Sequence, residues 1–210
     1  MKIAFFSEAG YEGKVSRDHP NMRTDVAWVC ALGATHHPIS NIHSIPDNTY
    51  DVGVMILPKN RKPLLSYPLL ENYKRVCKKV TIMQESYYNY WQDSSIEEQI
   101  WYFNFITQMD LIFCHNDVDL KYYNGLTNVR TELLPSVMIT DGIVPRSEWG
   151  DAVVIGGNFV WAYGGFDSYQ VARELTDNVH AVTTGRMKKE EEQVLRHIPW
   201  TLWREWIDIL

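Results

Sequence analysis

The sequence predicts an α/β fold: a Rossmann-like, doubly wound parallel sheet, followed by a second and shorter α/β domain. Two segments, residues 2–13 and 152–165, each pass from a short apolar strand into a glycine loop. Along the chain, short apolar strands alternate with helical segments. This alternation is typical of parallel sheets whose strands are joined by right-handed helical crossovers.

The strands expected in the first domain are short, continuously apolar and closed by a glycine, a proline or a polar loop. They cover residues 3–6, 37–39, 51–57, 80–83, 111–114 and 130–134. The helices expected between them are a segment that ends at residue 32, and residues 68–79, 96–108 and 117–125. Strands buried on both faces need no polar alternation, which agrees with a sheet covered by helices.

Polar residues mark the starts of these helices. Thr24 or Asp25 can cap the first helix, and Gly33 is its expected C′ residue. The run Ser94–Glu98 places serine before glutamate at the spacing of a capping box. Asp117 is the expected cap of the helix that follows the strand at 111–114.

A second α/β cycle begins after an irregular stretch. Residues 136–151 carry prolines and glycines without periodicity, as a linker does. A strand then starts at Ala152, and a helix near 168–176, a strand at 179–183 and a helix at 188–196 follow. We therefore divide the chain into an amino-terminal Rossmann-like domain (1–135), a linker (136–151) and the start of a second Rossmann-like domain (152–210).

The chain ends on an apolar run, Trp200–Leu210, without a polar tail. Trp200, Trp203 and Trp206 are spaced so that a helix would place them on one stripe. Termini normally lie at the surface. We therefore expect either that the second domain is cut short here, or that the stripe is covered, by a partner chain in a homodimer or by folding back onto the first domain.

The composition is that of a globular, cytoplasmic protein. Apolar residues make up 45% of the 210 residues, which is enough to build a core. A formal net charge of −6 argues against non-specific nucleic-acid binding, which needs clustered Lys and Arg. Cys30, Cys77 and Cys114 lie far apart and indicate neither a disulfide framework nor a zinc site. No apolar run approaches the roughly 20 residues of a membrane span.

Polar side chains follow the expected strands, where ligands bind in open α/β sheets. They are Ser7, Glu8, Lys59, Gln84, Glu85, Ser86, His115 and Asn116. Glu85 is the leading catalytic candidate, because the aromatic residues after it, including Tyr88 and Trp91, can desolvate its carboxylate. His115 is the second candidate. The alternatives are structural: a hydrogen-bond acceptor in a loop for Glu85, and a core or capping residue for His115.

The glycines of the first loop allow two interpretations. They let the backbone approach a ligand closely, or they only form tight turns. The run Gly10–Ser16 is similar to a phosphate-binding P-loop. However, Glu8 stands where that motif needs glycine, and Val15 where it needs serine or threonine.

Two further patterns have the residue types of metal ligands. The pair in Asp117-Val-Asp119 has the spacing of a site for a divalent ion, but Asp117 is well placed as a helix cap, so we expect no metal cofactor. His36 and His37 lack a third ligand at useful spacing, and we expect both at the surface.

The order and spacing of these segments resemble glycosyltransferases of the GT-B fold, in which two Rossmann-like domains face each other across a cleft. Gly10–Gly13, Gln84–Ser86 and Leu111–Asp117 are similar to loops of phage-type α-glucosyltransferases. In such families the amino-terminal domain mainly holds the acceptor, and the carboxyl-terminal domain holds the nucleotide-sugar donor.

The resemblance implies transfer of a sugar from a nucleotide-sugar donor to an acceptor that the sequence does not identify. The implied catalytic residues are Glu85 and His115. Those expected to bind the acceptor are Glu8, Gly10, Gly13, Lys14, Gln84, Tyr88 and Trp91, and those expected to bind the donor are Gly156, Gly157, Gly164 and Gly165. The alternative function is a non-catalytic α/β module that binds a ligand or a partner protein.

Overall fold

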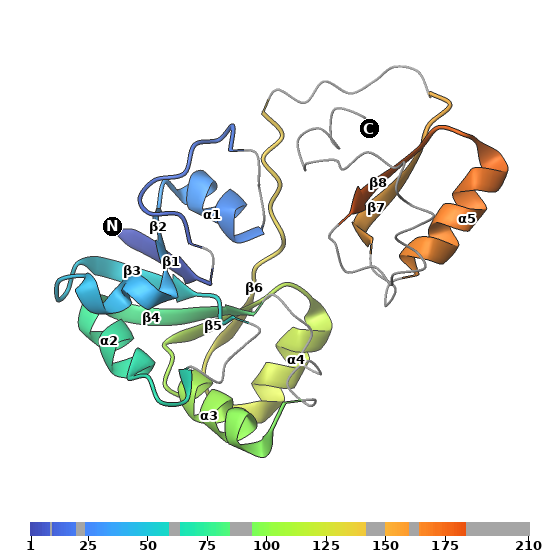
Figure 1. Cartoon of the computed structure of the whole chain (residues 1–210). Helices are drawn as coiled ribbons and strands as arrows, with labels where there is room; N and C mark the ends of the chain where they lie inside the picture. Colours follow the sequence, from blue (N-terminus) through green and yellow to red (C-terminus); the bar gives the residue numbers. More distant parts are fainter. Residues whose placement is uncertain are drawn as a thin grey trace. The chain divides into compact units, whose positions relative to one another are not determined.

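In a computed structural model of the chain, the structure describes residues 1–8, 10–19, 24–58, 64–84, 94–141, 150–159 and 164–183. The chain divides into two compact units, Met1–Ile139 and Thr140–Leu210. The first unit holds a six-stranded sheet in the order β2-β1-β3-β4-β5-β6, and the second holds a two-stranded sheet, β7-β8 (Figure 1). All of these pairs are parallel, which confirms the predicted Rossmann-like α/β class.

Strands and helices alternate along the chain as the sequence predicts. The strands are β1 (Ile3–Ser7), β2 (Thr35–Pro38), β3 (Tyr50–Met55), β4 (Cys77–Gln84), β5 (Leu111–Cys114), β6 (Thr131–Leu133), β7 (Val153–Phe159) and β8 (Val179–Thr183). The helices are α1 (Thr24–Leu32), the 3₁₀ helix η1 (Ile39–Ser44), α2 (Leu69–Val76), α3 (Ile96–Ile106), α4 (Asp117–Leu126) and α5 (Gly165–Leu175). No described helix is both long and apolar enough to cross a membrane.

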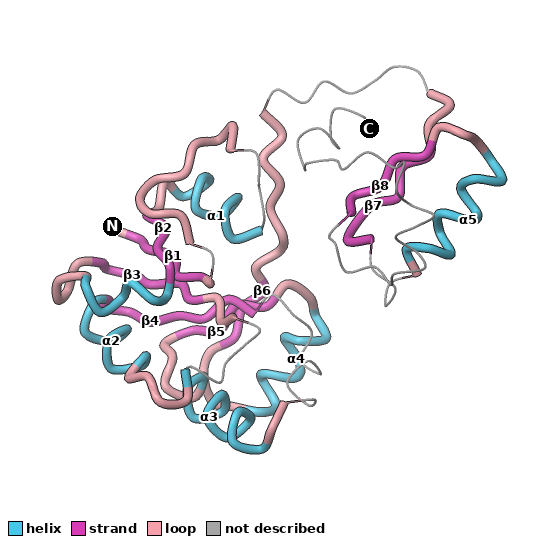
Figure 2. The backbone as a smooth tube through the Cα atoms, in the orientation of Figure 1, coloured by secondary structure: helices cyan, strands magenta, loops and turns pink. Residues whose placement is uncertain are grey.

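Helices cover the two faces of the large sheet unequally (Figure 2). On one face lies α1, whose Val29 packs in a small core cluster with Phe5 and Val54. On the other face lie α2, α3 and α4, where Tyr73 and Tyr123 are fully buried in the larger core cluster. The helix α1 has only nine residues, and a long loop joins it to β1. The carboxyl end of β1 therefore lies beside this loop and a short helix.

One boundary differs because of charge pairing at the edge of the sheet. The second predicted helix ends early, at Val76, and β4 follows directly. Lys78 and Lys79 resemble a polar helix end in the sequence, but they form ion pairs of 2.8 Å with Asp51 and Asp110. These aspartates lie at the amino ends of the neighbouring strands, so the lysines belong to the strand.

The second unit also differs from the prediction in one respect. β7 continues through Gly156 and Gly157, which the sequence analysis places in a loop after the strand. The pairing with β8 shifts register between Ile155 and Phe159, which is typical where glycines interrupt a strand. The helix expected at 188–196 and the tryptophan stripe of Trp200–Leu210 lie outside the described residues.

The start of α3 carries the predicted capping box. Ser95 Oγ accepts a hydrogen bond from the Glu98 N–H, and Glu98 Oε2 accepts one from the Ser95 N–H at 3.1 Å. We expect Ser95→Ala to lower the free energy of unfolding by about 1 kcal/mol, because the side chain that caps the helix is lost. Urea denaturation checks this, with Ser95→Asn as the matched control that keeps a capping oxygen. Equal losses in both variants would contradict the prediction.

Candidate functional site

The strand order reverses between β1 and β3. After β1 the chain runs to β2 on one side of it and then returns to β3 on the other side. In open α/β sheets, the carboxyl ends of the strands at such a switch point form the ligand-binding crevice. The end of β1, the adjoining part of β2 and the loop before α1 therefore outline the candidate site.

A buried polar cluster, Ser7–Asp25–His36, lies at this point. Ser7 ends β1, Asp25 lies in the first turn of α1 and His36 is in β2, and they are 5%, 5% and 0% exposed. His36 Nε2 lies 2.9 Å from Ser7 Oγ and 3.6 Å from Asp25 Oδ2. Asp25 Oδ1 is buried and has no hydrogen-bond partner within the described ranges. A buried polar atom of this kind is costly and marks a functional candidate.

The backbone fixes which nitrogen of His36 carries the proton. The Tyr11 N–H donates to Nδ1 at 3.3 Å, so Nδ1 is an acceptor and the proton of the neutral ring lies on Nε2. Nε2–H then donates to Ser7 Oγ. Ser7 thus receives a hydrogen bond and does not hand its own proton to the imidazole. The cluster is therefore arranged for binding and not as a Ser-His-Asp nucleophile.

The charge state of His36 follows from its burial. Burial lowers the pKa of His36, an effect that the Asp25 carboxylate opposes and that His37 and His19 reinforce. The ring is therefore neutral at pH 7 and keeps the tautomer described above. A neutral ring lets His36 hold the Tyr11 backbone and the Ser7 hydroxyl at once.

The prediction that His36 and His37 lie at the surface is wrong for His36, whereas His37 is half-buried. His36 is completely buried. The His37 ring stacks on Phe6 with centroids 5.7 Å apart, and its Nε2 lies 2.7 Å from the Tyr50 hydroxyl. The edge strand is covered because Gly13, from the loop before α1, pairs with His36 in an antiparallel bridge.

The predicted glycine loop closes over the edge of β2. The Gly13 N–H donates to the His36 carbonyl at 3.0 Å, and the His36 N–H donates to the Gly13 carbonyl at 2.7 Å. A Cβ on Gly10 would lie 2.1 Å from the His37 carbonyl oxygen, so only glycine fits there. Gly13 has a φ of 95°, in the left-handed region. The glycines hold this loop on the sheet, and α1 starts only at Thr24.

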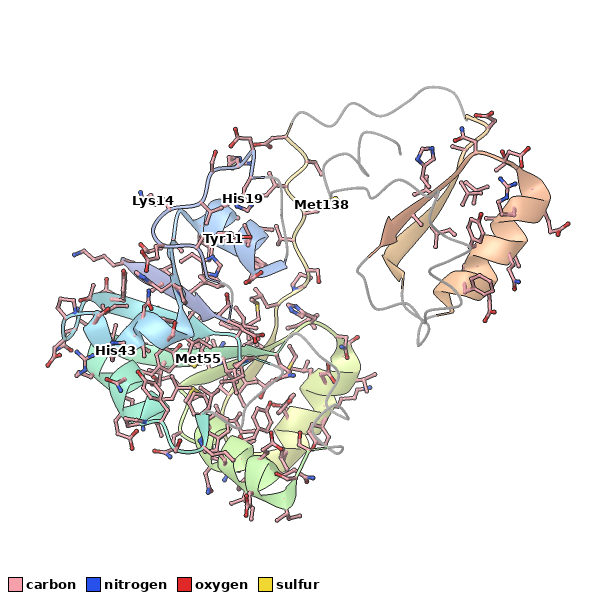
Figure 3. All side chains as sticks on the ribbon, in the orientation of Figure 1. Tyr11, Lys14, His19, His43, Met55 and Met138 are labelled. Atoms are coloured by element: carbon pink, nitrogen blue, oxygen red, sulfur yellow. The ribbon has the colours of Figure 1, made fainter. Side chains whose placement is uncertain are left out.

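The other residues expected in this loop lie at its surface. Glu8 directly follows β1 and is exposed, and Lys14 is exposed on the same loop. Figure 3 shows Lys14 pointing outwards, with Tyr11 and His19 on the same segment. The Tyr11 ring packs against His19 at 4.4 Å and thereby shields the cluster. Roles for Glu8 and Lys14 in acceptor binding stay predictions.

His115 directly follows β5 and has one free ring nitrogen. Its Nδ1–H donates to the Leu134 carbonyl at 2.7 Å, and its Nε2 is buried without a hydrogen-bond partner among the described residues. An imidazole held in this tautomer presents a lone pair, as a general base does. His115 and Ser7 are separated by three strand spacings, about 14 Å, so they do not touch but can flank one ligand.

Gln84 ends β4 on the opposite face. Its Oε1 accepts a hydrogen bond from the Tyr102 hydroxyl at 2.9 Å, and that hydroxyl lies 2.6 Å from the Tyr123 hydroxyl. Gln84 therefore joins the core under α3 and α4. Lys59, Glu85, Tyr88 and Trp91 lie outside the described residues, so the leading catalytic candidate stays a prediction.

Of the four glycines expected to bind the donor, two lie in a strand of the second unit and two lie at the start of its helix. Gly156 and Gly157 are strand residues of β7. Gly164 precedes α5 with a φ of 67°, and Gly165 is its buried first residue. Among the described residues no side chain caps this helix, and Asp167 places a carboxylate in its first turn; N–H groups at a helix start are of the kind that binds phosphate oxygens.

The start of α4 uses a different cap from the one predicted. Asn116, and not Asp117, caps the helix: its Oδ1 accepts from the Asp119 N–H at 2.9 Å, and its Nδ2 donates to Asp119 Oδ2 at 2.7 Å. Asp117 is instead the first helical residue. Within the ranges that the structure describes, no group of three or more His, Cys, Asp or Glu side chains is arranged to hold a metal ion.

The buried thiols offer no nucleophile. Burial raises the pKa of Cys77 and of Cys114 to about 12, so both stay protonated at neutral pH. Burial also raises the pKa of Cys30. None of the three thiols is therefore a candidate nucleophile.

Comparison with known proteins gives no match to a family model, a curated protein or a solved structure. The site is therefore interpreted from its residues. The sequence predicts Ser7 and His115 as site residues from their places after strands, but it indicates only a helix cap for Asp25 and a surface position for His36. No local pattern indicates that pair, because Asp25 belongs to α1 and His36 to β2 and they meet only in the folded chain.

Proposed function

We propose that this protein takes part in glycosyl transfer from a nucleotide-sugar donor, with its first unit holding the acceptor. The observation that carries the proposal is a six-stranded parallel sheet of Rossmann-like order, followed in the same chain by a second unit with a two-stranded parallel sheet. The first places hydroxyl-binding groups at its switch point, and the second starts a helix on two glycines. This combination suits an acceptor with hydroxyl groups and a donor with phosphates.

The proposed reaction breaks the bond between the anomeric carbon and the diphosphate and forms one to an acceptor oxygen. The acceptor hydroxyl gives its proton to His115 Nε2, whose lone pair is free among the described residues. The diphosphate leaves with the electron pair of the bond that breaks. Asp25 Oδ1 accepts a hydrogen bond from a second acceptor hydroxyl. Glu85 is retained as a further candidate base.

The net charge narrows the class of acceptor. A chain with a formal charge of −6 repels polyanions over the surface as a whole. A neutral hydroxyl-bearing molecule is therefore a better acceptor than a nucleic acid. This agrees with a cluster that offers a carboxylate, a hydroxyl and a neutral imidazole.

The test is release of UDP from UDP-glucose and UDP-galactose, with water as the surrogate acceptor. We expect slow release by the intact chain and a rate about 100-fold lower for His115→Ala, because general base catalysis contributes at least that much. His43→Ala is the matched control, since His43 is exposed on η1. Calorimetry is expected to show donor binding weaker than micromolar.

Two results would overturn the proposal. One is a wild-type chain that neither binds nor cleaves a nucleotide sugar, which would favour the non-catalytic binding module. The other is UDP release that His115→Ala and His43→Ala leave equally unchanged. Circular dichroism of each variant separates a loss of chemistry from a loss of fold.

A further inference from the structure

A cavity of about 340 Å³ opens on the flank of the first unit, between the segment before α2 and the helix α3. Tyr67, Trp101 and Phe105 form its aromatic lining, and Glu71 and Asn104 are among its polar residues. The volume lies in the range of small-molecule sites. The cavity lies in the helical layer, so the cluster at the carboxyl ends of the strands does not include it.

The aromatic wall is rigid. The Trp101 and Phe105 rings stack with centroids 5.2 Å apart and an interplanar angle of 23°. Phe105 is only 3% exposed and belongs to the main core, whereas Trp101 is half-buried at the edge of that core. A ring fixed in this way presents a flat apolar surface to a ligand at little cost in conformational entropy.

The polar lining selects against negative charge on the ligand. Glu71 is the only charged residue among the described residues that line the cavity, so phosphates and carboxylates are repelled. Asn104 adds an amide that can donate and accept hydrogen bonds, whereas the Gln108 amide already binds Lys74 Nζ and the Asn104 carbonyl. The Tyr67 hydroxyl oxygen is buried and lacks a hydrogen-bond partner in the described part of the chain. A ligand hydroxyl that reaches this oxygen would remove that unfavourable state.

We propose that this cavity binds a neutral sugar ring, with the apolar face of the ring on Trp101. Its hydroxyl groups bind Tyr67 Oη, Asn104 and the Glu71 carboxylate. A wholly apolar ligand would leave these polar groups unpaired, and an anion would meet Glu71. The inference does not rest on the glycosyl-transfer proposal, because it needs neither a nucleotide nor a reaction. It assigns a second carbohydrate site, separate from the candidate site at the switch point.

The test is fluorine NMR of the full chain labelled with fluorotryptophan, titrated with methyl α-glucoside and with maltotriose. The Trp101 signal is assigned from its loss in Trp101→Phe. We expect this signal to shift saturably with sugar. In calorimetry, we expect affinity to fall about tenfold in Trp101→Ala, because a stacking contact is lost. We expect it to fall about fivefold in Tyr67→Phe, which removes only the hydroxyl.

Ile100→Ala is the matched control, because Ile100 is exposed on α3 and does not line the cavity. It should bind sugar as the wild type does. A Trp101 signal that neither sugar shifts would overturn the proposal. So would equal affinities in the wild type and Trp101→Ala. Because no nucleotide is present, these outcomes are independent of the UDP-release assay.

Discussion

Gly53→Ala is expected to lower the free energy of unfolding by about 3 kcal/mol, because the core has no room for the added methyl group. Gly53 lies in β3, and a Cβ there would meet Tyr73 Cε2 at 2.4 Å and Cys77 Sγ at 2.6 Å. Tyr73 is completely buried, and its hydroxyl donates to the Thr81 carbonyl at 2.7 Å. The ring is therefore fixed by both packing and hydrogen bonding.

Urea denaturation of the intact chain, followed by circular dichroism, measures the effect. Gly125→Ala is the matched control: Gly125 is a helical residue of α4 with open space at the Cβ position. It is expected to gain up to about 1 kcal/mol, because alanine favours a helix. Combining Gly53→Ala with Tyr73→Leu should recover part of the loss. A Gly53→Ala variant as stable as the wild type would contradict the steric argument.

Gly53 also illustrates how far the sequence predicts this fold. Apolar runs closed by glycine or proline give the strands, and the serines of Ser94–Glu98 give the start of α3, because these signals are local. In the sequence, Gly53 is only one residue of an apolar strand. Its need for glycine comes from Tyr73, which belongs to the next helix, so no periodicity reveals it.

The residues of the candidate site also fall into those that the sequence predicts and those that it does not. Ser7 and His115 were predictable, because a residue just after a parallel strand lies at the carboxyl edge of the sheet. Asp25 and His36 were not, because they belong to different elements, α1 and β2, and meet only in the folded chain, where Gly13 also covers the edge of β2. Tertiary pairing turned an apparent surface histidine into the centre of a buried cluster.

The stability of the first unit is expected to fall as the pH is lowered from about 7 to about 5. Burial lowers the pKa of both His36 and His37 in the folded chain, whereas an unfolded histidine titrates near about 6.5. Below that pH, the unfolded chain binds protons that the folded chain does not, so the free energy of unfolding falls as the pH is lowered. Above that pH, both states hold neutral histidines and the free energy of unfolding keeps its full value. The pKa of Asp51 is lowered to about 2, so its stabilising contribution is present at neutral pH and is lost only at more acidic pH.

The substitution His36→Leu separates the contribution of His36 to this pH dependence from that of His37. At about pH 7 the variant should lose about 3 kcal/mol, because Ser7 Oγ and the buried Asp25 carboxylate lose the imidazole. The difference in the free energy of unfolding from the wild type should shrink towards about pH 5. Only the wild type has a His36 that is protonated in the unfolded chain and kept neutral in the folded chain, so only the wild type loses that stability in acid. His43→Leu, at an exposed site, should leave both values unchanged.

The double variant His36→Leu with Asp25→Leu decides between two causes of that loss. If it comes from leaving a buried carboxylate without its partner, removing both groups should cost less than removing His36 alone. If it comes only from packing, the second substitution should add to the first. Urea denaturation at the two pH values measures both. A His36→Leu penalty that is the same at both pH values would show that the neutral imidazole does not hold the Ser7–Asp25–His36 cluster together.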